Sequence, residues 1–356
     1  MSTVILNPTT PSTDIPNQNV DNGGRTVKAT PGADSIQGSV GSDDISTLED
    51  DDLVAAGPGN DKVSLGTGDD IATGGADNDD LQGNQGNDSI DGGEGNDTVR
   101  GGKNEDTVKG GVGDDSVYGD QGDDTVSGED DNDFVQGNAG NDLVEGNAGN
   151  DTVRGGKDQD TVKGGVGDDS VYGDQGDDTV SGEEGNDFVQ GNTGNDLVEG
   201  GAGENTLRGG KDQDTLIGGQ NSDSLYGGKG NDSLIGGAGA DKFYLRFDQN
   251  GSFGVDTLTD FDREDDKILL RVEDFSALAD TLTAGNNLPA DEFAVISNFD
   301  PQSEGNNEAA IIYDPVNGSI YYDPKSPLND AVKIAQVDEN TFDVNNPLED
   351  TDFEIF

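Results

Sequence analysis

One acidic residue recurs at a fixed interval through most of this chain. A nine-residue repeat occurs 24 times between Ala29 and Tyr244, and its sixth position is Asp in 23 copies and Asn205 in the other. A representative copy reads GGEGNDTVR over 92–100, so each carboxylate follows a Gly-rich turn. Carboxylate and carbonyl oxygens are the ligands that Ca²⁺ prefers in proteins, in a more flexible geometry than Mg²⁺ or Zn²⁺ accepts. The repeat therefore predicts a row of calcium sites.

The predicted ligands are the position 6 carboxylates and the carbonyl oxygens of the turns. The first five repeats are the least regular, and the side-chain ligands are predicted from the fourth repeat onward: Asp61, Asp70, Asp79, Asp88, Asp97, Asp106, Asp115, Asp124, Asp133, Asp142, Asp151, Asp160, Asp169, Asp178, Asp187, Asp196, Asp214, Asp223, Asp232 and Asp241. The carbonyl ligands are exemplified by Gly92, Gly93, Gly95, Gly110, Gly111 and Gly113. If each ion is shared with the turn one coil further on, 24 turns offer at most 22 sites.

Charge indicates that these ions are needed for folding. The 29–244 segment contains 49 acidic and 11 basic residues, and adjacent strands would stack this charge at intervals of about 4.8 Å. Without cations such a chain should repel itself and remain disordered. Calcium binding and folding are therefore expected to be one equilibrium.

The apolar pattern predicts the elements that position these turns. Position 8 is apolar in every copy, and positions 7 to 9 alternate polar, apolar, polar, as in Thr98, Val99 and Arg100. This alternation predicts a three-residue strand after six turn residues, with one side chain inside. Two repeats then form an 18-residue coil with two facing sheets. The predicted fold is all-β: a parallel β-roll solenoid of 24 nonapeptides, or about 12 coils, capped by a small β-rich domain.

A second period of 54 residues, three coils, places Arg and aromatic residues on one sheet. The segment 101–154 recurs almost verbatim as 155–208. The resulting candidate contact residues, here called the Arg–aromatic row, are Arg100, Tyr118, Phe134, Arg154, Tyr172, Phe188, Arg208 and Tyr226. The row fits a repetitive partner, such as an extracellular glycan or a second copy of the roll. The simpler interpretation is that aromatic residues suit exposed strands and the duplication copied them.

The flanking segments differ in composition from the repeats. Residues 1–28 are polar and rich in Pro, Asn and Thr, and are predicted to be a flexible leader with a short capping strand. Residues 245–356 are predicted to be the β-rich cap, with strands at 242–247 and 267–270 and a hairpin over 310–322 that turns at Asn317 and Gly318. One or two helical turns are predicted over 275–282.

The repeats resemble the RTX, or hemolysin-type, calcium-binding repeats of secreted bacterial proteins. GGAGADKFYLRF at 236–247, DTLTDF at 256–261 and DKILL at 266–270 are similar to the segment that follows such repeats in serralysin-type proteins. The ending DFEIF at 352–356 resembles the acidic and then apolar end of their export signal. The resemblance implies an extracellular or cell-surface location, reached through type I export machinery.

Composition excludes several other functions. The net charge is −57, which argues against nucleic acid and anionic membrane surfaces as partners. The chain has no His and no Cys, so His-based zinc sites and Ser-His-Asp or Cys-His catalysis are impossible. No apolar stretch is long enough to span a membrane. Carboxylate-pair catalysis remains open chemically, but no pocket-forming domain precedes the repeats, and we predict no enzyme.

Two functions from different classes fit these observations. The first is a secreted, non-catalytic, calcium-dependent structural protein of the cell surface or matrix. The alternative is an extracellular polysaccharide-binding module that uses the Arg–aromatic row, as in the RTX modules of alginate epimerases. Calcium is the predicted cofactor of both.

Overall fold

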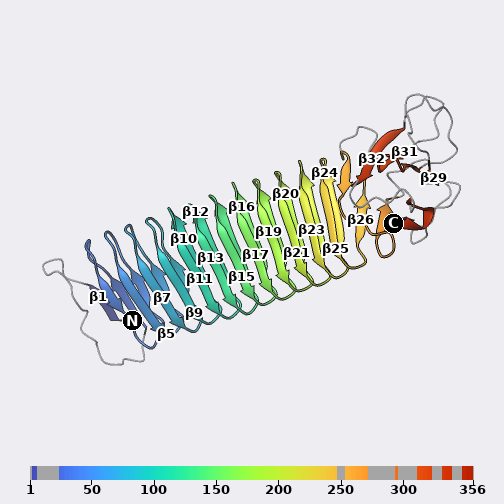
Figure 1. Cartoon of the computed structure of the whole chain (residues 1–356). Coiled ribbons are helices and arrows are strands. Elements are labelled where there is room, and N and C mark those ends of the chain that lie inside the picture. Colours follow the sequence, from blue (N-terminus) through green and yellow to red (C-terminus); the bar gives the residue numbers. More distant parts are fainter. Residues whose placement is uncertain are drawn as a thin grey trace. The chain divides into compact units, whose positions relative to one another are not determined.

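A computed structural model describes residues 2–5, 24–246, 253–271, 293–295, 311–322, 331–338 and 347–355. The chain divides into two units, 1–184 and 185–356. Figure 1 shows parallel strands stacked side by side within each unit. The predicted fold class is confirmed: the chain is an all-β parallel β-solenoid of about 12 coils.

Each coil of the first unit contributes one strand to each of two sheets. The first sheet contains β1 (Ser2–Ile5), β2 (Arg25–Lys28), β4 (Asp44–Ser46), β6 (Lys62–Ser64), β8 (Asp80–Gln82), β10 (Thr98–Lys103), β12 (Ser116–Gln121), β14 (Phe134–Ala139), β16 (Thr152–Lys157) and β18 (Ser170–Gln175). The second contains β3 (Ser35–Gln37), β5 (Leu53–Pro58), β7 (Ile71–Ala76), β9 (Ser89–Glu94), β11 (Thr107–Val112), β13 (Thr125–Asp130), β15 (Leu143–Ala148), β17 (Thr161–Val166) and β19 (Thr179–Glu184).

The second unit repeats this arrangement and adds a β-rich end. Its first sheet contains β20 (Phe188–Thr193), β22 (Thr206–Lys211), β24 (Ser224–Lys229), β26 (Lys242–Leu245), β28 (Lys267–Leu270) and β33 (Phe353–Ile355), which follows a 3₁₀ turn, η2 (Asp350–Asp352). Its other strands are β21 (Leu197–Ala202), β23 (Thr215–Gln220), β25 (Ser233–Ala238), β27 (Asp256–Leu258), β29 (Phe293–Val295), β30 (Ile311–Asp314), β31 (Ser319–Tyr322) and β32 (Val332–Val337).

The register of the sheets follows the 18-residue coil. In the first unit Val99 pairs with Val117 and Val117 with Val135, so each position 8 residue stacks on its counterpart one coil along. All position 8 side chains from Ile36 to Phe243 are buried, most of them completely. The thin interior expected from the sequence is therefore a ladder of aliphatic side chains between the two sheets.

The strands are longer than the sequence predicted. From β9 to β25 they have six residues, because the backbone stays extended through positions 1 to 3 and pairs there with the next coil, as Gly102 does with Asp120. Only positions 4 to 6 remain as the turn. The backbone of these coils has positive φ at position 2, in the strand, and at position 4, in the turn, and all 15 described non-Gly residues with positive φ lie at these two positions. They include Glu129 (φ 84°) and Glu183 (φ 76°), residue types that rarely adopt this conformation.

Parallel pairing continues after the last nonapeptide. β27 pairs with β25 and β28 with β26, as the repeats do, although the paired residues are now further apart in the sequence than one 18-residue coil. The predicted hairpin is confirmed, since β30 and β31 pair antiparallel around Gly318 (φ 72°). β1 pairs with β2, so the short strand predicted within residues 1–28 is present. The predicted helical turns at 275–282 lie outside the described residues.

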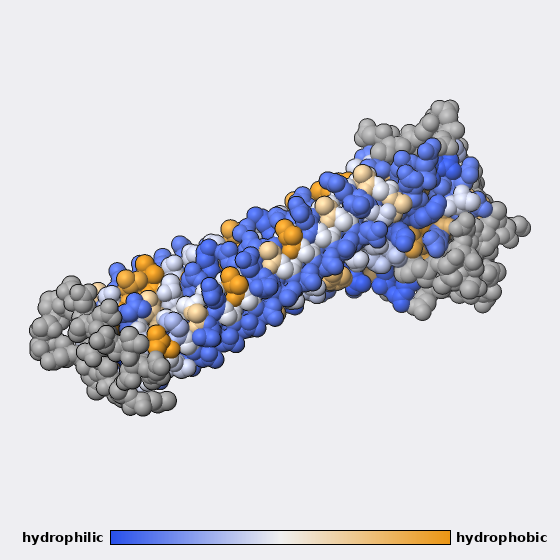
Figure 2. Space-filling view, turned by 90° about the horizontal axis from the view of Figure 1, so that it is seen from below, coloured by the Kyte–Doolittle hydropathy of each residue, from blue (hydrophilic) through white to orange (hydrophobic). Residues whose placement is uncertain are grey.

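The surface of the roll is mainly hydrophilic. On the face drawn in Figure 2 hydrophobic residues occur as separate spots among hydrophilic ones. Among the described residues, no helix is long and apolar enough to span a membrane.

Candidate metal centre

The position 6 carboxylates form a ladder along each side of the roll. In most repeats the backbone N–H of the position 6 residue donates to Oδ1 of its counterpart 18 residues further on, as from Asp97 to Asp115 (2.7 Å) and from Asp106 to Asp124 (2.8 Å). The same bond recurs in the second unit, for example from Asp214 to Asp232 (3.0 Å). These side chains are 1–4% exposed. One carboxylate oxygen therefore holds successive coils together.

The other oxygen, Oδ2, is buried and has no hydrogen-bond donor in many of these turns. Within the described part of the chain this applies to Asp52, Asp61, Asp70, Asp79, Asp88, Asp97, Asp106, Asp115, Asp124, Asp133, Asp142, Asp151, Asp160, Asp214, Asp223 and Asp232. An unpaired buried polar atom costs about 1–3 kcal/mol, and more when it is charged. The repetition of such an atom in so many turns indicates that these oxygens bind a cation.

Position 1 glycine keeps the space beside this oxygen open. A methyl group on Gly92 would lie 2.5 Å from Oδ2 of Asp97 and 2.5 Å from the carbonyl oxygen of Gly110, one coil further on. At Gly74 the corresponding atoms are Oδ2 of Asp79 (2.4 Å) and the carbonyl oxygen of Gly92 (2.5 Å). Gly92 and Gly74 do not have positive φ. Glycine is required here by space, because a carboxylate oxygen and a carbonyl oxygen face the same point.

Burial without a counterion raises the affinity of these carboxylates for protons. Burial raises the pKa of Asp106 to about 8, the hydrogen bond from the Asp88 backbone opposes the shift, and the neighbouring Asp124 carboxylate increases it. The same causes raise the pKa of Asp133 and Asp214 to about 8. A bound cation would reverse this effect, because it stabilises the ionised carboxylates.

The donor set fits calcium. In the described residues no three acidic side chains meet at one point, so a cation here would take backbone carbonyls as well as carboxylates. Hard oxygen ligands from a Gly-rich turn are what Ca²⁺ accepts. Of the predicted carbonyl ligands, those of Gly92 and Gly110 lie beside Oδ2 atoms. Those of Gly93 and Gly95 face Gly111 and Gly113 of the next coil, and as ligands they remain a prediction.

The ladder has ends that the sequence did not predict. In the first repeat Oδ2 of Asp34 accepts hydrogen bonds from the backbone N–H (2.8 Å) and hydroxyl (3.0 Å) of Thr30. After the last repeat, Asp256 and Asp266 accept the N–H groups of Asp232 (3.2 Å) and Asp241 (2.9 Å). These two continue the ladder at spacings of 24 and 25 residues, so a search for the nine-residue period misses them.

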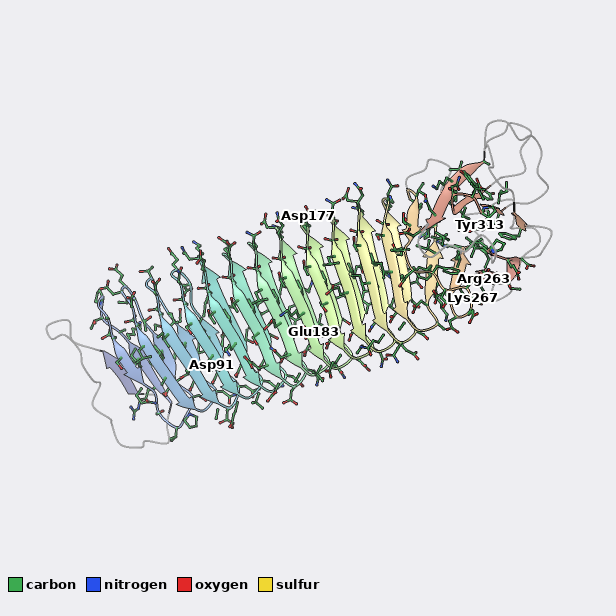
Figure 3. The ribbon with its side chains drawn as sticks, viewed as in Figure 1. Asp91, Asp177, Glu183, Arg263, Lys267 and Tyr313 are labelled. Carbon is green, nitrogen blue, oxygen red and sulfur yellow. The ribbon has the colours of Figure 1, made fainter. Side chains whose placement is uncertain are left out.

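Position 5 carries a second ladder that the sequence analysis overlooked. Oδ1 of Asp123 accepts the backbone N–H of Asn141 (2.8 Å), and Oδ1 of Asn132 accepts that of Asn150 (2.9 Å). These bonds point in the opposite direction along the roll to those of position 6. Asp177, another position 5 residue, lies at the margin of the strands in Figure 3. The frequent Asn and Asp at this position were the available signal.

The Arg–aromatic row forms contacts within the roll. The Arg100 guanidinium lies 3.9 Å from the Tyr118 ring centre, and that of Arg154 lies 4.7 Å from Tyr172. In the second unit Arg208 lies 5.2 Å from both Phe188 and Tyr226, and Tyr118 contacts Phe134 in the first unit at 5.8 Å. Arg154 also donates two hydrogen bonds to Asp174 (2.7 and 3.0 Å). The row therefore links neighbouring strands of one sheet.

A polar groove of about 480 Å³ lies next to part of this row. It is lined by Gln82, Asn84 and Gln85 and by residues of β10, β12 and β14. The strand residues include Lys103, Asp120 and Asn138. Its lining offers amide, carboxylate and ammonium groups to a ligand rich in hydroxyl groups.

Comparison with protein families agrees with this site. The profile described as RTX calcium-binding nonapeptide repeat (4 copies) matches residues 28–63, 64–99, 73–108, 91–126, 100–135, 127–162, 155–189, 181–216, 190–225 and 217–251. These matches cover more than half of the chain, and the chain belongs to the RTX calcium-binding nonapeptide repeat family. No curated protein matches the chain with significant similarity.

Proposed function

We propose that the protein is secreted, that its roll folds on binding many Ca²⁺ ions outside the cell, and that it has a non-catalytic structural role at the cell surface or in the matrix. The observation that carries this proposal is the series of buried Oδ2 atoms that have no donor, many of them beside a backbone carbonyl of the next coil, as Oδ2 of Asp97 is beside that of Gly110. At low cytosolic calcium the repulsion between these carboxylates keeps the chain unfolded and suited to type I export. Extracellular calcium then supplies the ligand within the affinity range of extracellular modules.

The residues of the chain have separate tasks in this proposal. Oδ1 of Asp97 or Asp106 holds the neighbouring coil by a hydrogen bond, and Oδ2 binds the ion. Gly92 leaves room for the ion and, like Gly110, supplies a carbonyl. Bound calcium contributes positive charge and oxygen coordination, and the free energy of binding becomes free energy of folding.

A calcium titration followed by far-UV circular dichroism tests the proposal, with magnesium as the control. We expect a cooperative gain of β signal with calcium and a much smaller one with magnesium. A complete β signal in excess chelator, or uptake of only one or two ions per chain, would contradict it.

The Arg–aromatic row and the adjoining polar groove favour extracellular polysaccharide binding as the second candidate. Stacking of Arg100 on Tyr118 supports a purely intramolecular role, whereas the groove beside them has the polar lining that a glycan requires. A glycan-affinity screen in saturating calcium distinguishes the candidates. If replacing Tyr118, Tyr172 and Tyr226 with Ser leaves retention on carbohydrate and self-association unchanged, the row is not a contact surface.

A further inference from the structure

We infer that the turn of Asn205 carries no cation, so that one of the two rows of sites is interrupted at that turn. This inference rests on the proposal that Oδ2 of the position 6 aspartates is the calcium ligand. It concerns the one repeat in 24 whose sixth residue is not Asp.

Asn205 keeps the hydrogen bonds by which a position 6 aspartate joins neighbouring coils. Its Oδ1 accepts the backbone N–H of Asp187 (2.8 Å), and its own N–H donates to Oδ1 of Asp223 (2.8 Å). The side chain is 2% exposed, like its aspartate counterparts. Because a backbone N–H can only donate, the atom that faces Asp187 must be the amide oxygen. This hydrogen bond fixes the orientation of the amide, which coordinates alone often leave ambiguous.

The second polar atom of the Asn205 side chain is a nitrogen that donates hydrogen bonds, whereas that of an aspartate is an oxygen that accepts them. A methyl group on Gly200 would lie 2.7 Å from Nδ2 of Asn205 and close to the carbonyl oxygen of Gly218. In the matched repeat of the same unit, a methyl group on Gly209 would meet Oδ2 of Asp214 and the carbonyl oxygen of Gly227. The space that holds an acidic oxygen beside Gly209 thus holds an amide NH₂ beside Gly200. An amide nitrogen has no lone pair for a hard cation, and its hydrogens repel one.

The Asn205 turn has a contact that takes the place of the ion. Nδ2 donates to the carbonyl oxygen of Gly203 within the same turn (3.3 Å). The Asn205 side chain carries no charge, so it adds nothing to the repulsion between buried carboxylates that calcium has to offset. The ladder of coils continues through Asn205 without requiring a cation there.

Counting bound ions in two reciprocal variants of the full chain tests the inference. Native mass spectrometry in saturating calcium should give one more ion per chain for Asn205→Asp than for the wild type. Asp214→Asn, the matched control, should give one fewer. Circular dichroism in calcium establishes that each variant has formed the roll before its ions are counted. An unchanged count for a folded Asn205→Asp overturns the inference.

The wild-type protein provides a second test that does not depend on a variant folding. Crystals grown in calcium should show an anomalous peak beside Gly209 and none beside Gly200. A peak beside Gly200 overturns the inference even if every other prediction holds. Absence of all peaks, or an unchanged ion count in Asp214→Asn, would instead contradict Oδ2 as the calcium ligand. The two failures can therefore be distinguished.

Discussion

The position 6 aspartate makes different contacts in the first two repeats and in the centre of the first unit, residues 107–166. In the first two repeats position 2 is Thr30 or Ser39, and their N–H and hydroxyl groups bind Oδ2 of Asp34 and Asp43 at 2.5–3.0 Å. In the centre position 2 is Gly or a residue with positive φ, and Oδ2 of residues such as Asp106 has no donor.

This difference shows what a solenoid requires of a calcium turn. Where position 2 carries a hydroxyl group, the chain itself supplies hydrogen bonds to Oδ2, and a position 2 glycine leaves Oδ2 to the ion. The first coils are therefore expected to depend less on calcium than the centre. Strand length differs as well, chiefly on the first sheet: β4, β6 and β8 of the first sheet have three residues, whereas β5 and β7 of the second sheet and every strand from β9 to β25 have six.

Calcium removal should have the largest effect and should separate the two regions. In excess chelator we expect loss of most of the β signal, because the centre then has buried carboxylates without counterions. Hydrogen exchange followed by mass spectrometry should show the centre, 107–166, losing protection at a higher residual calcium concentration than the first coils. Simultaneous loss of protection in both regions would contradict the comparison.

Acid should partly replace calcium in the centre. Burial raises the pKa of Asp106, Asp133 and Asp160 to about 8 in the folded state, above the unfolded value of about 3.9. Folding therefore takes up protons, and this stabilisation is complete below about pH 4 and disappears as pH rises through 8. In chelator, β signal should increase from pH 8.5 to pH 5. A decrease over that range would show that repulsion between the carboxylates is not what unfolds the calcium-free chain.

Substitution of a crowded and of an uncrowded glycine tests the space required at position 1 of the repeat. Gly92→Ala would place a methyl group 2.5 Å from both Oδ2 of Asp97 and the Gly110 carbonyl. It should destabilise the calcium-bound roll by about 1–3 kcal/mol through overpacking. Gly32→Ala, at position 4 of the first repeat, meets no atom within 4 Å and should change stability by less than about 1 kcal/mol. Thermal unfolding in saturating calcium measures both, and equal effects would contradict the role assigned to position 1.

Ser39→Ala should have the smallest effect and should remain local. It removes a hydroxyl that lies 3.0 Å from both carboxylate oxygens of Asp43, worth about 0.5–1.5 kcal/mol. We expect faster hydrogen exchange near β4 and an unchanged number of bound calcium ions. A change in that number would mean that the Asp43 turn also holds an ion.

The regular part of the fold could be predicted from the sequence because every coil repeats the same residue types at the same positions. The apolar residue at position 8 and the nine-residue period predicted the 18-residue coil and the parallel β-roll, and Asp at position 6 predicted where the carboxylates recur; their burial became evident only in the structure. The strand length was underestimated, because extension of positions 1 to 3 depends on pairing with a neighbouring coil. Asp256 and Asp266 were missed because the nine-residue period ends before β27 and β28 while the pairing in space continues.

Sequence alone determined the period, the residue types of each position and the family. Only the tertiary structure decided how each carboxylate divides its two oxygens, with Oδ1 bound to the preceding coil and Oδ2 directed to the space beside a position 1 glycine. It also decided that Asn205 presents nitrogen where Asp214 presents oxygen. These outcomes depend on atoms 18 residues apart in the chain, which only the stacking of the coils brings together.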